Sequence, residues 1–79
     1  MSKCYITNNI RTLRFMTNEM TQQVLADKTG VTRQTIVAIE NSKYFPTLEL
    51  AFRISRVFNV PLDEVFSFNE DETTNLTSK

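Results

Sequence analysis

Residues 20–44 read Met-Thr-Gln-Gln-Val-Leu-Ala-Asp-Lys-Thr-Gly-Val-Thr-Arg-Gln-Thr-Ile-Val-Ala-Ile-Glu-Asn-Ser-Lys-Tyr. Thr21 and Thr32 each precede a run with helical spacing, and a threonine hydroxyl there accepts a hydrogen bond from the first helical turn. Gly30, the only glycine of the chain, stands where a left-handed residue ends one helix and leads into the next. The stretch therefore predicts two short helices, over 22–28 and from 33 to about 40, joined in helix-turn-helix geometry.

Further helices are predicted on both sides of this unit. Upstream, one face repeats at spacings of four, three and four through Ile6, Ile10, Leu13 and Thr17. Thr7 or Asn8 would cap that helix. Downstream, residues 41–46 form a loop and Thr47 caps a fourth helix, whose repeat is Leu48, Ala51, Ile54, Val57 and Phe58, with Leu50 and Phe52 beside it.

The end of the chain predicts a fifth helix over 61–66, because proline suits the first helical turn. Phe66 and Phe68 then alternate with polar residues as in a strand, which Tyr5 and Ile6 could pair with over 66–69. The fold class is therefore all-α: a compact five-helix bundle containing a helix-turn-helix, with a possible short terminal two-stranded β-sheet. We expect one domain over 1–69 and a disordered acidic and polar tail over 70–79.

Composition argues against catalysis and metal binding. The 79 residues include no histidine and a single cysteine, Cys4, so neither a zinc cluster nor the commonest general base is available. No Ser/His/Asp, Cys/His or phosphate-loop pattern is present. The sequence predicts no enzyme, no cofactor, no metal and no small-molecule ligand. Without an apolar run of about 18–20 residues or a secretory signal, we predict a cytoplasmic protein that does not enter membranes.

Charge is unevenly distributed although the net charge is zero. Residues 1–56 hold eight basic and four acidic side chains, whereas residues 57–79 hold five acidic side chains and one lysine. A basic body can present a positive face to nucleic acid despite an acidic end.

Residues 8–66 resemble the phage-repressor Cro/CI-like (XRE) helix-turn-helix family. The resemblance is carried by residues 20–44, by Pro-Thr-Leu-Glu-Leu-Ala at 46–51 and by Val-Pro-Leu-Asp-Glu-Val-Phe at 60–66. It implies that the helix after Thr32 enters the major groove of DNA. In relatives glycine is usual at the position of Ser42.

The resemblance assigns roles to individual residues, and their chemistry agrees. Arginine can hold guanine and glutamine can hold adenine, while apolar groups can meet a thymine methyl. The base-reading residues are therefore predicted to be Arg33, Gln34, Val37 and Ala38. Phosphate contacts, which fix register without reading sequence, are predicted for Gln22, Thr32, Asn41, Lys43 and Tyr44. Arg14 and Glu40 are joined inside the domain in relatives and are predicted to form a structural ion pair.

The aromatic residues divide into two groups. Phe15, Phe45, Phe52 and Phe58 fall mostly on apolar helical faces, which favours core packing over base stacking. The end of the domain instead forms an apolar surface, predicted to be a dimer interface, from Val60, Leu62, Val65, Phe66 and Phe68. Completion of the monomer core is the alternative for these side chains.

The function predicted is a sequence-specific double-stranded DNA-binding transcriptional regulator. Two copies would bind a near-palindromic operator, and repression is favoured over activation. The alternative is a protein-interaction module, such as an antitoxin or adaptor, that uses the same fold through its acidic tail and the Phe66–Phe68 surface.

Overall fold

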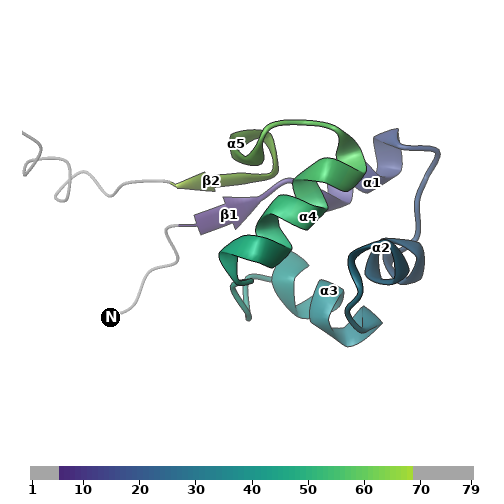
Figure 1. The fold of residues 1–79 in the computed structure, drawn as a ribbon, viewed down its shortest axis with the longest axis horizontal. Coiled ribbons are helices and arrows are strands. Elements are labelled where there is room, and N and C mark those ends of the chain that lie inside the picture. Colours follow the sequence, from purple (N-terminus) through teal and green to yellow (C-terminus); the bar gives the residue numbers. More distant parts are fainter. Residues whose placement is uncertain (1–5, 69–79) are drawn as a thin grey trace, which may run out of the picture.

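Five short helices and one small sheet make up residues 6–68, the part of the chain that the computed structural model describes (Figure 1). The elements are β1 (Ile6–Asn8), α1 (Ile10–Met16), α2 (Gln22–Thr29), α3 (Arg33–Glu40), α4 (Leu48–Phe58), α5 (Leu62–Val65) and β2 (Phe66–Phe68). The predicted all-α architecture with a short two-stranded sheet is confirmed. Tyr5, Cys4 and the predicted tail at 70–79 lie outside the described residues. No helix within 6–68 has the length and apolar character to cross a bilayer.

The helix boundaries follow the capping chemistry of the sequence. The hydroxyls of Thr21, Thr32 and Thr47 accept hydrogen bonds from the backbone N–H three residues further on, at 3.1, 3.2 and 3.2 Å. Gly30 adopts φ +80°, and its N–H donates to the carbonyl of Ala26 at 2.8 Å. Left-handed backbone of this kind closes a helix C-terminus, so the predicted turn between the second and third helices is confirmed.

All five helices contribute to one hydrophobic core. Its buried members are Ile10, Leu25, Ala26, Ile36, Ile39, Leu50, Ile54, Phe58 and Val65. Ile36 and Ile39, predicted to face inward, are 0% and 2% exposed. Because these two side chains anchor one side of α3, the opposite side of that helix is held toward solvent.

The two ends of the domain meet in an antiparallel pair of strands. Ile6 pairs with Phe68 and Asn8 with Phe66, as the terminal pairing predicted. The inclusion of Ile6 in the first helical face was wrong, because α1 begins only at Ile10. The Oδ1 of Asn8 accepts the Ile10 N–H at 3.2 Å, and its Nδ2 donates to the carbonyl of Ile39 at 2.9 Å. Asn8 therefore starts α1 and ties β1 to the end of α3.

Several apolar side chains predicted to be internal are instead exposed. Phe15, Phe45 and Phe52 are 68%, 50% and 48% exposed, so core packing was wrong for them and right for Phe58. Leu48 is also exposed, because the buried face of α4 consists of Leu50, Ala51, Ile54, Ser55 and Phe58. Periodicity identified the helix but placed its buried face in the wrong rotation.

Ser42 ends α3 in a backbone conformation that glycine adopts more easily. Its φ is +60°, its N–H donates to the carbonyl of Ile39, and the next N–H donates to Ala38. We expect Ser42→Gly to stabilise the domain by about 0.5–1 kcal/mol, because relief of left-handed strain exceeds the added entropy of the unfolded chain. Thermal unfolding measures the change. Ser67→Gly in β2 is the control and should destabilise; a loss of stability in both variants would contradict the expectation.

Candidate nucleic-acid interface

The first turn of α3 projects from the domain with its side chains exposed. Arg33 and Gln34 face solvent, and Thr32 caps the helix beside them while its hydroxyl lies 3.0 Å from that of Thr35. The guanidinium and amide of these residues match the hydrogen-bonding edges of guanine and adenine. Because Ile36 anchors the same helix in the core, both groups are presented from a fixed support.

Val37 and Ala38 lie one turn further along α3 and are half-buried. The carbonyl of Ala38 accepts the N–H of Lys43 at 2.8 Å, which folds the following loop back onto the helix. Each side chain keeps some exposed apolar surface, which is enough for a contact with a thymine methyl.

A polar groove lies beside this turn, between α1, the start of α2 and both ends of α3. It is lined by Arg11, Arg14, Thr21, Gln22, Gln23, Arg33, Glu40 and Asn41. The fold thus brings together three residues that sequence analysis had proposed as DNA contacts: Gln22, Arg33 and Asn41. Lys43 and Tyr44 are exposed in the loop after α3 and do not line this groove.

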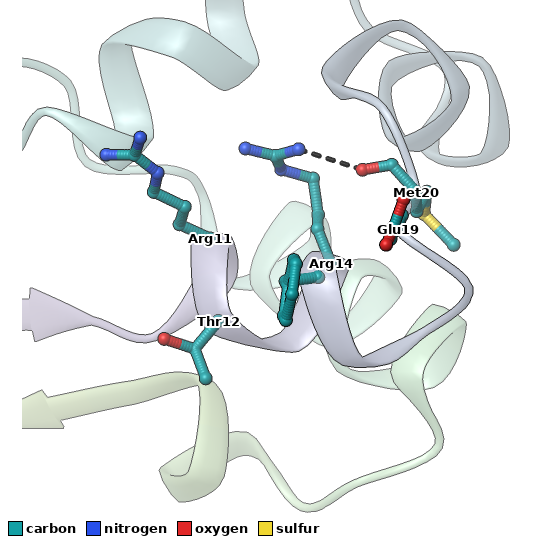
Figure 2. A pocket seen from close by; sticks show the side chains of 6 residues that line it. Arg11, Thr12, Arg14, Glu19 and Met20 are labelled. Carbon is teal, nitrogen blue, oxygen red and sulfur yellow. Dashed lines mark hydrogen bonds between the residues drawn. The ribbon is translucent and has the colours of Figure 1, made fainter.

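An ion pair forms the inner wall of the groove. The Nε of Arg14 donates to Oε2 of Glu40 at 2.7 Å, and Nη2 donates to Oε1 at 3.2 Å. The third guanidinium nitrogen, Nη1, donates to the carbonyl of Met20 at 2.8 Å (Figure 2). The two side chains are 14% and 8% exposed. They join α1, the α1–α2 loop and the end of α3 into one rigid unit.

Gln22 also belongs to this network, a contact that sequence analysis missed. Its Nε2 donates to Oε1 of Glu40 at 3.2 Å, across 18 positions of sequence. An amide nitrogen carries two hydrogens, so one remains for a second acceptor. The first N–H groups of α2 have no acceptor within their own helix and point outward beside it. Together these donors can hold a phosphate oxygen.

Arg11 and Gln23 line the groove but were not proposed from sequence. Arg11 lies three residues before Arg14, and residues at this spacing share a helix face. Figure 2 shows both arginine side chains extending from the same side of α1. The spacing could have identified Arg11 once the position of Arg14 was assigned.

A separate apolar hollow lies at the terminal sheet. It is lined by Ile6, Leu62, Asp63, Phe66, Ser67 and Phe68. Three residues of the predicted dimer surface, Leu62, Phe66 and Phe68, lie here. Val65 is 0% exposed within the core of its own chain, which corrects its assignment to a partner-facing surface. Val60 packs partly against that core.

Two threonine-capped helices joined at Gly30, with an exposed basic turn at the start of the second, define a helix-turn-helix domain. The family model described as helix-turn-helix matches residues 10–65. The chain belongs to this family, in its Cro/CI-like (XRE) branch.

Curated relatives extend the similarity along the chain. An HTH-type transcriptional regulator of Methanocaldococcus jannaschii is 46% identical over 65 residues, covering 82% of this chain and 97% of the relative. One of Archaeoglobus fulgidus is 51% identical over 53 residues, covering 67% and 75%. The regulator YgzD of Bacillus subtilis is 42% identical over 50 residues, covering 63% and 76%. The chain is thus similar to regulators from both archaea and bacteria.

Proposed function

We propose that this chain is a sequence-specific double-stranded DNA-binding transcriptional regulator that acts as a homodimeric repressor. The observation that carries the proposal is the exposed first turn of α3, where Arg33 and Gln34 project beside a polar groove. The similar proteins named HTH-type transcriptional regulators support the same role.

Contacts with DNA divide into two kinds in this proposal. Arg33 and Gln34 read base edges in the major groove, assisted by apolar contacts of Val37 and Ala38. The phosphate contacts come from Gln22 and Thr32 on one side and from residues after α3 on the other: Asn41, Lys43 and Tyr44. Contacts of this second kind set the register of α3 without distinguishing sequences.

The apolar hollow at β2 is the proposed meeting point of two copies. Phe68 is 62% exposed there, and Leu62 and Phe66 continue the apolar surface. A twofold pairing would present two α3 helices to successive major grooves about 34 Å apart, on a near-palindromic site. Occupation of such a site would exclude polymerase from an overlapping promoter.

Introducing a charge into this surface should separate the dimer. We expect Phe68→Glu to weaken dimerisation at least about 100-fold, because the twofold axis removes one buried aromatic from each copy. Sedimentation equilibrium measures the association. Phe15→Glu is the matched control, since Phe15 is 68% exposed on α1, away from the hollow. Equal association of parent and Phe68→Glu would place the interface elsewhere.

Selection of bound duplexes from random DNA tests the function directly. We expect recovery of a shared motif with two related half-sites, their centres about 10–10.5 base pairs apart. A reporter carrying that motif across its promoter should then be silenced by the protein. Recovery of no shared motif would contradict sequence-specific binding and favour the protein-interaction role.

A further inference from the structure

The polar groove contains more positive charge than its ion pair neutralises. Three arginines and one glutamate line it, and Arg14 is bonded to Glu40. All three guanidinium nitrogens of Arg14 are committed, two to Glu40 and one to the carbonyl of Met20. Arg11 and Arg33 therefore supply the uncompensated charge of the groove.

Arg11 is exposed and makes no hydrogen bond or ion pair with any residue in the span 6–68. It projects from α1, whereas Arg33 projects from α3 on another wall of the same groove. The donors of Gln22 and of the first turn of α2 also face this groove. The combination of an unpaired guanidinium and convergent N–H donors suits an oxyanion.

We propose that Arg11 is a phosphate ligand for DNA and that α1 therefore takes part in the interface. Its guanidinium binds a phosphate beside the one held at the start of α2, while Arg14 acts as a positioning residue that fixes α1 against α3. The proposal rests on the proposed function, because the anion is taken to be the DNA backbone. Arginine suits this role, since its planar fork can bind two phosphate oxygens at once.

A phosphate contact has a distinctive signature in binding measurements. Removing one lowers affinity for all sequences alike and reduces the log–log salt slope by about 0.9. We expect Arg11→Ala to reduce the slope by this amount per subunit, so that each lost contact removes about 3.5-fold of the affinity change between about 50 and 200 mM salt. Arg11→Lys should keep the slope, because the charge remains.

Fluorescence anisotropy with the selected duplex and with a scrambled duplex, over a salt series, provides the test. Arg56→Ala is the control, since Arg56 is an exposed cation on α4 that does not line the groove. An Arg11→Ala slope equal to that of the parent overturns the proposal. So does a change in the affinity ratio between the two duplexes that exceeds the change in their common affinity.

The test separates this proposal from the proposed function. If the parent prefers the selected duplex and Arg11→Ala leaves the slope unchanged, sequence-specific binding stands and the role of Arg11 fails. If the parent shows no preference but Arg11→Ala still lowers the slope on both duplexes, Arg11 binds phosphate and sequence reading by α3 fails.

Discussion

Replacing Arg33 and Gln34 together by alanine is expected to abolish the preference for the operator while leaving a folded protein. Each good contact to a base edge contributes about 1–3 kcal/mol of discrimination, so the two losses remove roughly 30-fold to 20,000-fold of selectivity per half-site. Both side chains are exposed and neither takes part in the hydrogen bonds described within 6–68, so the fold does not depend on them.

Competition between the selected duplex and scrambled DNA measures this loss. Arg56→Ala, which removes an arginine charge from the far end of α4, controls for a general decrease in attraction to DNA. The double variant should retain salt-dependent binding to both duplexes, because its phosphate ligands remain. Unchanged selectivity would show that α3 does not read bases.

Glu40→Ala is expected to produce the largest loss of stability in the chain. The substitution leaves Arg14 charged, largely buried and without its carboxylate, which typically lowers the free energy of unfolding by about 3–5 kcal/mol. Small domains have total stabilities of about 5–15 kcal/mol, so a substantial unfolded population is expected. Urea unfolding measures the difference.

Glu49→Ala provides a matched control because Glu49 also pairs with an arginine. Its carboxylate lies 2.8 Å from Nη2 of Arg53, but the two side chains are 75% and 55% exposed. An exposed pair one helical turn apart contributes only about 0.3–0.5 kcal/mol. Similar losses in the two variants would contradict the argument that burial gives the Arg14–Glu40 pair its importance. Glu40→Gln, which retains an acceptor, should lose less than Glu40→Ala.

Sequence was sufficient wherever local chemistry decides the structure. The caps at Thr21, Thr32 and Thr47 and the turn at Gly30 depend on residues within four positions of each other. The same locality explains why the start of α3, and hence the exposure of Arg33 and Gln34, could be predicted.

Sequence was insufficient where distant segments compete for the same surface. Ile6 fits a helical repeat, but pairing with Phe68 places it in a strand. Leu48 and Phe52 share a helix with the core residues, yet which face of α4 is covered depends on the neighbouring helices. The bond from Gln22 to Glu40 and the burial of Val65 are likewise set by tertiary packing, which composition and spacing do not report.

The independence of Arg33 and Gln34 from the fold has a consequence for how such proteins diverge. Substitutions at these two positions alter what the helix recognises without disturbing the core beneath Ile36 or the bonds of Glu40. A duplicated copy could therefore acquire a new operator through one or two changes while remaining as stable as its ancestor. Separation of this kind lets selection act on target choice without first restoring lost stability.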